Sequence, residues 1–318
     1  MAVAFQVYNK ARVREYTQIP YGLEWSVKNV LVTGANGQLG KELRRLASGY
    51  LQFRFLFTDI EELDITNKDA LATFVKQHNI HYIVNCAAYT AVDKAEDDQA
   101  SCFRINRDGA ALLAQVAAEE GAKLLHVSTD YVFDGDATAP YKEDDLTDPK
   151  SVYGKSKLAG EQAVLFYCPE SMIVRTSWLY SSFGNNFVKT MIRLGKEKRQ
   201  LSVVSDQTGS PTYAADLAEV LLLLLAEGEL LNFIPGIYHF SNEGVCSWSD
   251  FAATVLRLYG NEETQIVPIA SEEYPAKAPR PRNSVFDKDK IKTTYQIVIP
   301  RWEESLKECI DELKKAGY

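Results

Sequence analysis

Short apolar runs alternate with amphipathic segments along most of the chain. The first clear run, 30–33, leads directly into a glycine-rich turn and then into a segment, 41–46, whose apolar residues recur at helical spacing. Further apolar runs are separated by helical patterns, and these runs are 53–57, 82–88, 123–127 and 172–175. Strands that alternate with helices predict an α/β fold with a doubly wound parallel sheet. Ligands of such sheets bind beyond the carboxyl ends of the strands.

Two further apolar patterns indicate buried helices rather than sites. The run 221–225 is the most apolar stretch, but Glu227 follows it closely, so it falls far short of the roughly 20 residues that cross a bilayer. The segment 302–313 carries apolar residues at 302, 306, 310 and 313, one face of a helix. We therefore predict no membrane partner, and a final helix that docks through this stripe.

Composition narrows the class of protein. The chain has 318 residues, 46% of them hydrophobic and 25% charged, which is ordinary for a soluble protein of one large or two modest domains. A net charge of -8 argues against a nucleic-acid partner. The five cysteines lack disulfide or metal spacing, so we predict no metal site and a cytoplasmic location. Residues 1–28 show no signal-peptide pattern and form an arm of unknown role.

The turn after the first apolar run has the spacing of a dinucleotide site. Gly34, Gly37 and Gly40 allow a tight bend, close approach of the backbone to a pyrophosphate, and close packing of the next helix. Asp59 ends the second run, where a carboxylate would bind a ribose 2′-hydroxyl and repel a 2′-phosphate, which favours NADH over NADPH. The alternative is a strand-end turn aspartate. Asp64 is predicted either to lie beside the adenine or to cap the next helix.

A tyrosine and a lysine lie four residues apart at the start of a predicted helix. This spacing places Tyr153 and Lys157 on one helical face, where the cation favours the phenolate and lowers the tyrosine pKa. Taken alone, the pair is a weak signal. The run 123–127 ends in Ser128 and Thr129, which adds hydroxyl groups at the same predicted edge of the sheet. The pair therefore becomes a candidate for acid/base chemistry.

Several further motifs are distributed along the chain. These motifs are GANGQLG at 34–40, NCAAYTAVDKAE at 85–96, STDYVF at 128–133, YGKSKLAGE at 153–161, RTSW at 175–178, DQTGSPT at 206–212 and RPRNS at 280–284. Together they resemble the extended short-chain dehydrogenase/reductase superfamily and, within it, the family of dTDP-4-dehydrorhamnose reductases. The resemblance covers the chain from residue 29 to about 310 and leaves the N-terminal arm outside.

The resemblance implies that the protein reduces a keto sugar, and it implies which residues take part. It makes Thr129, Tyr153 and Lys157 the catalytic groups, which reduce the 4-keto group of dTDP-4-dehydro-L-rhamnose to give dTDP-L-rhamnose for cell-surface polysaccharide, with NADPH or NADH as cofactor. Tyr153 donates the proton, and Lys157 also holds the nicotinamide ribose. Besides Tyr153 and Lys157, the predicted cofactor-binding residues are Gly34, Asn36, Gly37, Gln38, Leu39, Asp59, Asp64, Ile65, Ala87, Ala88 and Tyr89.

The resemblance also divides the chain and points to the substrate. Residues 29–175 are expected to form mainly a Rossmann-type cofactor domain, and 176–318 mainly a smaller nucleotide-sugar region, with the two interleaved. The residues expected to bind the dTDP-sugar are Asp130, Tyr131, Trp178 and Arg280. Arg280 is expected to bind the diphosphate of the dTDP-sugar. Trp178 as a core residue and Arg280 as a surface residue are the alternatives. A homodimer is compatible with the resemblance, but Ala215 replaces a glutamate of metal-linked relatives.

Other functions on the same fold are distinguishable. A dehydratase of the superfamily carries an Asp-Glu pair after the Ser/Thr, whereas Tyr131 follows Asp130 here. An epimerase retains its cofactor through the catalytic cycle, whereas a reductase exchanges it. A non-catalytic NAD(P)-binding regulatory subunit is the alternative from another class. The intact Thr129, Tyr153 and Lys157 argue against that alternative.

Overall fold

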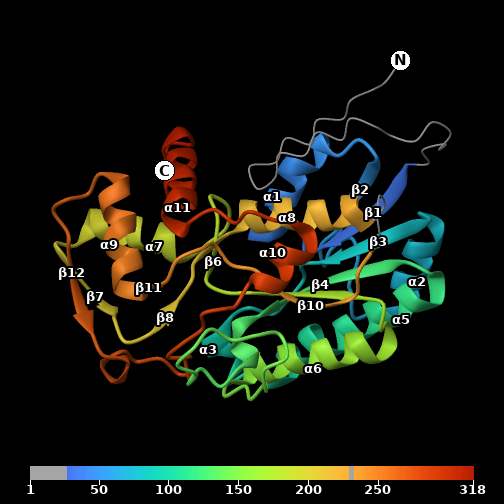
Figure 1. Cartoon of the computed structure of the whole chain (residues 1–318), viewed down its shortest axis with the longest axis horizontal. Coiled ribbons are helices and arrows are strands. Elements are labelled where there is room, and N and C mark those ends of the chain that lie inside the picture. The colour runs from blue at the N-terminus through green and yellow to red at the C-terminus, as the bar shows by residue number, and fades with distance from the viewer. Residues whose placement is uncertain (1–26, 229–232) are drawn as a thin grey trace.

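The computed structural model describes residues 27–228 and 233–318. The predicted arm, 1–28, therefore lies outside the described residues except for its last two, and Lys28 already begins the first strand. Within the described residues, the central sheet has six strands in the order β10-β5-β4-β3-β1-β2 (Figure 1). These strands are β1 (Lys28–Thr33), β2 (Phe53–Phe57), β3 (Ile80–Asn85), β4 (Lys123–Thr129), β5 (Met172–Thr176) and β10 (Gly236–His239).

Every strand pair in this sheet is parallel, as the alternating pattern predicts. Helices α1 (Gln38–Leu46) and α8 (Ala214–Glu227) cover one face, and α2 (Lys68–Gln77), α5 (Ala110–Glu120) and α6 (Val152–Tyr167) cover the other (Figure 1). Successive residues of a strand point to opposite faces. Val30 and Val32 accordingly pack in the core beneath α1 and α8, and Leu31 packs with α2 and α5. Both faces of the sheet are buried, which explains the continuous apolar runs.

The apolar run 221–225 lies within α8 and is completely buried or nearly so, which confirms the predicted buried helix. Its residues pack against α1 and the sheet. Among the described residues, no helix is long and apolar enough to cross a membrane.

A second lobe surrounds its own hydrophobic core. The final helix, α11 (Trp302–Lys315), enters this core through Trp302, Leu306, Ile310 and Leu313, each 5% exposed or less, which confirms the predicted docking stripe. The lobe comprises α7 (Phe187–Glu197), β7 (Gln200–Val204), β8 (Thr208–Gly209), β11 (Cys246–Ser247), α9 (Trp248–Tyr259), β12 (Gln265–Ile269) and α11 (Trp302–Lys315). Strands β6 (Leu179–Tyr180) and β9 (Thr212–Tyr213) pair in parallel beside it.

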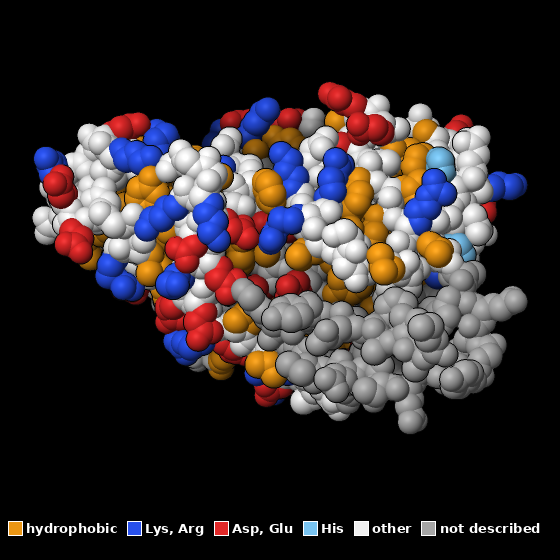
Figure 2. Space-filling view, turned by 90° about the horizontal axis from the view of Figure 1, so that it is seen from above, with side chains coloured by type: hydrophobic (Ala, Val, Ile, Leu, Met, Phe, Trp, Pro, Cys, Tyr) orange, Lys and Arg blue, Asp and Glu red, His pale blue; other side chains and the backbone are white. Residues whose placement is uncertain are grey.

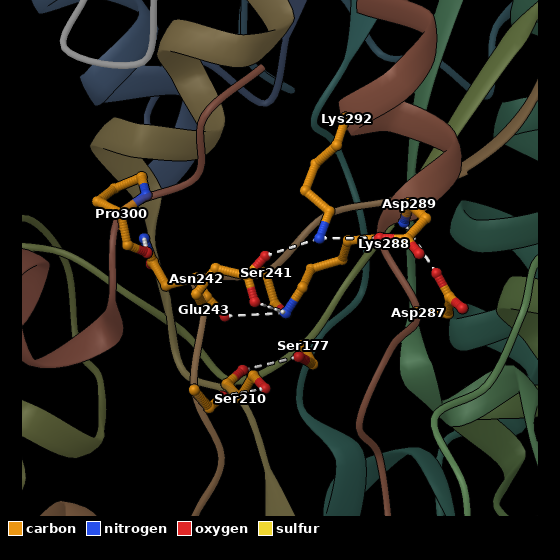
Figure 3. Close-up of polar contacts among 11 residues, drawn as sticks. Ser177, Ser210, Ser241, Asn242, Glu243, Asp287, Lys288, Asp289, Lys292 and Pro300 are labelled. Atoms are coloured by element: carbon orange, nitrogen blue, oxygen red, sulfur yellow. Dashed lines mark hydrogen bonds and ion pairs between the residues drawn. The ribbon is translucent and has the colours of Figure 1, made fainter. Parts of the chain in front are cut away.

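The two lobes exchange chain segments. Strand β10 comes after residue 176 yet completes the sheet beside β5, and α10 (Asp289–Tyr295) packs against β10. Buried polar groups hold this crossing together (Figure 3). The ammonium of Lys288 contacts the Ser241 hydroxyl, the Asn242 carbonyl and the Glu243 carboxylate at 3.3–3.4 Å. The exact division at residue 175 stays a prediction.

Acidic and basic side chains are interspersed over the face drawn in Figure 2. All five cysteines are unpaired thiols, and four of them are buried. Within the described residues, no three His, Cys, Asp or Glu side chains come together in a group that would hold a metal ion.

Candidate active site

Two glycines where β1 leads into α1 have no room for a side chain, Gly34 in the turn and Gly40 in the first turn of α1. Gly34 has φ +65°, and a Cβ there would lie 2.6 Å from the backbone nitrogen of Ala87. A Cβ at Gly40 would lie 2.5 Å from the Gly34 carbonyl oxygen. Glycine is therefore required at both positions, one for the bend and one for the close packing of α1 against the turn. The predicted strand, glycine turn and helix are confirmed.

The N-terminus of α1 is chemically suited to an anion. Its N-cap, Gly37, supplies no side-chain acceptor for the first free N–H groups of the helix. These groups and the positive end of the helix dipole face the cavity lined by Gly37, Gln38 and Leu39. A dinucleotide pyrophosphate fits this position, because the glycines keep the approach open and the helix carries no competing cap.

Asp59 lies where the turn and β2 meet. Its Oδ2 accepts a hydrogen bond from the Asn36 backbone N–H at 2.8 Å, and its Oδ1 accepts one from the Ile60 N–H. Asp59 also lines the cavity. The carboxylate therefore holds the glycine turn and keeps lone pairs for a ribose hydroxyl. The two predicted roles of Asp59, as a ligand of the ribose and as a structural turn residue, are compatible in this geometry.

The other predicted cofactor residues divide into two groups. Asp64, Ile65, Ala87 and Ala88 line the cavity, whereas Tyr89 is not among its lining residues. Asp64 accepts from the Thr66 N–H and hydroxyl, which lowers its pKa. It caps this turn, while α2 is capped by Asn67, so the expectation that Asp64 caps the next helix is wrong. Tyr89 instead donates its backbone N–H to Asn106.

Asn106 is a supporting residue that the sequence pattern did not single out. It lies in a π-helical segment, Arg104–Gly109, which leads directly into α5. Such segments often mark functional sites. The side-chain amide of the buried Asn106 accepts a hydrogen bond from the Tyr89 backbone N–H and donates one to the Tyr89 carbonyl. It also donates to the Ser156 hydroxyl at 2.9 Å. It thus joins the loop after β3 to α6.

The predicted catalytic residues meet at the carboxyl end of β4. Helix α6 begins at Val152 with Ser151 as N-cap, so Tyr153 lies in its first turn and Lys157 one turn later, as predicted. Thr129 is the last residue of β4, and its hydroxyl donates to the Asp130 carboxylate beside Tyr153. The Lys157 ammonium donates to the Val127 carbonyl at 2.7 Å. All three side chains line one cavity.

Burial controls the ionisation of this group. It raises the pKa of the Tyr153 phenol well above its usual value, opposed by the hydrogen bond with Thr129. It also lowers the pKa of the Lys157 ammonium to about 8, opposed by the Glu161 carboxylate. The expectation that the neighbouring cation lowers the tyrosine pKa is therefore wrong for this structure. Loss of hydration dominates the Tyr153 pKa, and the Lys157 ammonium is directed at the Val127 carbonyl rather than at the phenol.

Three of the four predicted substrate residues line the same cavity, namely Asp130, Tyr131 and Trp178. Burial raises the pKa of Asp130 to about 6, and its Oδ1 accepts from the Thr129 hydroxyl at 2.9 Å. The Tyr131 ring meets the Tyr153 ring edge to face, with centroids 5.4 Å apart. Tyr131 therefore packs directly against the predicted proton donor.

Arg280 is the exception among the predicted substrate residues. It is not among the residues that line the cavity. Its guanidinium donates to the Tyr131 phenol at 2.9 Å and to the Asp93 carboxylate at 2.6 Å. These two partners account for its position, because they balance its charge beside Tyr131. Diphosphate binding by Arg280 stays a prediction, and in this structure Arg280 is a support for Tyr131.

The cavity joins the two lobes. Its volume is about 750 Å³, large enough for a dinucleotide beside a sugar. One wall comes from the glycine turn and the ends of β3 and β4. The opposite wall comes from residues 176–179 and from Asn185 and Asn186. The Asn186 amide donates to the Gln38 side chain at 2.9 Å and so ties the second lobe to the start of α1, a contact that sequence reasoning missed.

The parallel sheet, the glycine turn and the Tyr153–Lys157 pair define a Rossmann-type protein of the short-chain dehydrogenase/reductase class. The chain belongs to the family described as RmlD substrate binding domain, whose model matches residues 28–315.

Relatives in bacteria span nearly the same length as this chain. A dTDP-4-dehydrorhamnose reductase of Aggregatibacter actinomycetemcomitans is 43% identical over 286 residues, which are 87% of this chain and 97% of that protein. The spore coat polysaccharide biosynthesis protein SpsK of Bacillus subtilis is 42% identical over 290 residues, 90% of this chain and 98% of that protein.

Solved structures of the same family have the same fold as this chain. A dTDP-4-dehydrorhamnose reductase of Clostridium acetobutylicum has a TM-score of 0.85 and 44% identity, with 90% of this chain and 99% of that chain covered. The Bacillus anthracis enzyme of the same name, solved in complex with NADP, has a TM-score of 0.83 and 42% identity, with 90% and 100% covered.

Proposed function

We propose that this chain reduces the 4-keto group of dTDP-4-dehydro-L-rhamnose with NADPH or NADH, giving dTDP-L-rhamnose for polysaccharide synthesis in the cytoplasm. The observation that carries the proposal is the meeting of Thr129, Tyr153 and Lys157 with the glycine turn in one cavity. The similarity to dTDP-4-dehydrorhamnose reductases supports the choice of sugar and nucleotide, and the similarity to a spore coat polysaccharide protein supports the polysaccharide role.

The chemistry follows from the residues present. A bound nicotinamide dinucleotide would supply the hydride. Tyr153 donates its phenolic proton to the alkoxide that develops at the sugar, and its raised pKa keeps that proton in place beforehand. Thr129 hydrogen-bonds the same oxygen. Lys157 supplies a positive charge one helical turn from the phenolate that remains, and Asp130 accepts a hydrogen bond from a hydroxyl of the sugar beside the reacting carbon.

The direct test mixes the purified protein with dTDP-4-dehydrorhamnose and either NADPH or NADH, and follows the loss of nicotinamide absorbance. Stoichiometric oxidation of the cofactor with formation of dTDP-rhamnose is expected. Tight dinucleotide binding without turnover would instead point to the non-catalytic subunit. Conversion of the sugar without added cofactor would point to an epimerase.

We expect kcat/KM to fall on both sides of a maximum between about pH 6 and about pH 8. The ammonium of Lys157 is lost as the pH rises through its pKa of about 8, and the Asp130 carboxylate is lost as the pH falls through its pKa of about 6. Initial rates across the pH range measure both limbs. Asp130→Asn should remove the acid limb and retain the alkaline one; an unchanged acid limb would assign it to another group.

We expect the enzyme to accept NADH, and Asp59→Asn to shift its preference toward NADPH. The amide retains an acceptor for the Asn36 N–H but removes the charge that would repel a 2′-phosphate. The ratio of kcat/KM for the two cofactors should change about tenfold, equivalent to roughly 1.4 kcal/mol. Glu62→Gln is the matched control, since Glu62 accepts from the Asp59 backbone N–H. If the ratio of kcat/KM for NADPH and NADH were unchanged in Asp59→Asn, Asp59 would not be the residue that binds the ribose hydroxyl.

A further inference from the structure

Trp178 has an unusual backbone conformation at the edge of the cavity. Its φ is +48°, in the left-handed region that a bulky residue rarely adopts. Neighbouring contacts hold this conformation: the Trp178 carbonyl accepts from the Thr212 N–H at 3.2 Å, and the Ser177 hydroxyl donates to the Ser210 carbonyl at 2.8 Å (Figure 3). Strained residues that persist in this way cluster at functional sites.

The Trp178 indole is held as firmly as its backbone. It stacks on Trp248 with ring centroids 3.6 Å apart and planes 8° from parallel. At another part of the ring, a Cβ added to Gly209 would lie 2.6 Å from Trp178 Cε2. Only glycine leaves space for the indole there.

Trp248 is itself fixed from behind. It is the first residue of α9, where Ser247 and Asp250 form a reciprocal capping box. The Phe187 ring packs against it with centroids 4.7 Å apart. Trp178 and Trp248 both remain partly exposed, and of the two only Trp178 lines the cavity. A rigid chain of contacts thus runs from α9 to the cavity wall.

We propose that Trp248 and Gly209 are positioning residues, which hold Trp178 as a fixed aromatic wall against the sugar of the substrate. This inference rests on the proposed function. A sugar ring presents C–H groups that pack on an aromatic face. Binding is stronger when the face is immobilised beforehand, since no side-chain freedom is then lost on binding. Simple core packing would not require the left-handed conformation of Trp178 or its place at the cavity.

The test compares Trp248→Ala and Trp248→Phe with the wild type. Trp248→Ala should raise KM for the dTDP-sugar about tenfold, with a smaller change in kcat and unchanged affinity for NADPH. Trp248→Phe restores an aromatic support and should recover most of the KM. Two stacked indoles give an exciton couplet in circular dichroism, which both variants should lose. Trp302→Phe is the control: Trp302 is buried beside Phe251, so the couplet and KM should persist.

Gly209→Ala supplies a second approach to the same wall. Its methyl group should displace the indole, raise KM and reduce the couplet while α9 stays intact. Calorimetric binding of dTDP-L-rhamnose gives the same comparison without turnover. Unchanged sugar affinity in a folded Trp248→Ala protein that has lost the couplet would overturn the inference. Wild-type turnover tests the proposed function, whereas the ratio of variant to wild type tests this inference, so the two fail separately.

Discussion

Tyr153→Phe is expected to lower kcat by about 10²–10⁴-fold, the usual contribution of a positioned general acid. The change removes only the phenolic oxygen and retains the ring that packs against Tyr131. The glycine turn and the start of α1 do not depend on that oxygen, so the dissociation constant for NADPH should stay within a few-fold of the wild type. Single-turnover kinetics and fluorescence titration of NADPH measure the two quantities.

Tyr131→Phe is the matched control for the loss of a phenol. Tyr131 also lines the cavity, and its hydroxyl accepts a hydrogen bond from Arg280. The variant should therefore lose sugar affinity more than kcat. Near-normal turnover in Tyr153→Phe would show that the proton comes from another group, and Asp130, whose pKa burial raises to about 6, would be the first to test.

The sequence predicted those parts of the site that depend on local spacing. The glycine turn and the Tyr153–Lys157 pair are each contained within a few residues, and the parallel sheet follows from alternating strands and helices. The site contacts that were missed join distant segments. Arg280 meets Asp93 across 187 residues, and the stacking of Trp178 on Trp248 exists only after the second lobe has packed.

The pKa of Tyr153 illustrates a second limit. From the sequence, a lysine one turn away lowers the tyrosine pKa, because only the charge is visible. In the structure the Tyr153 phenol is buried, and the Lys157 ammonium donates a hydrogen bond to the Val127 carbonyl. Both features depend on the tertiary fold. The identity of the substrate is likewise not encoded in any local spacing, and it rests on the relatives.

Glu161→Ala is expected to lower the free energy of unfolding by about 3–5 kcal/mol, because it leaves a buried cation without its partner. The Glu161 and Arg175 side chains are 2% and 3% exposed, and their closest contact is 2.7 Å. The Arg175 guanidinium donates to both carboxylate oxygens of Glu161. Urea unfolding measures the loss. The exposed pair of Arg193 and Glu197 is the control, and its removal should cost less than about 1 kcal/mol.

The same substitution should also reach the active site. Glu161 lies one turn beyond Lys157 on α6, and its carboxylate opposes the fall in the Lys157 pKa that burial causes. Glu161→Ala should therefore lower that pKa further and move the alkaline limb of the activity profile to lower pH.

The double variant Glu161→Leu with Arg175→Met should recover much of the stability, since a buried pair replaced by apolar side chains of similar volume is often neutral. It should not recover the alkaline limb, because the carboxylate beside Lys157 is still missing. Recovery of both would show that Glu161 acts on Lys157 only through the packing of α6.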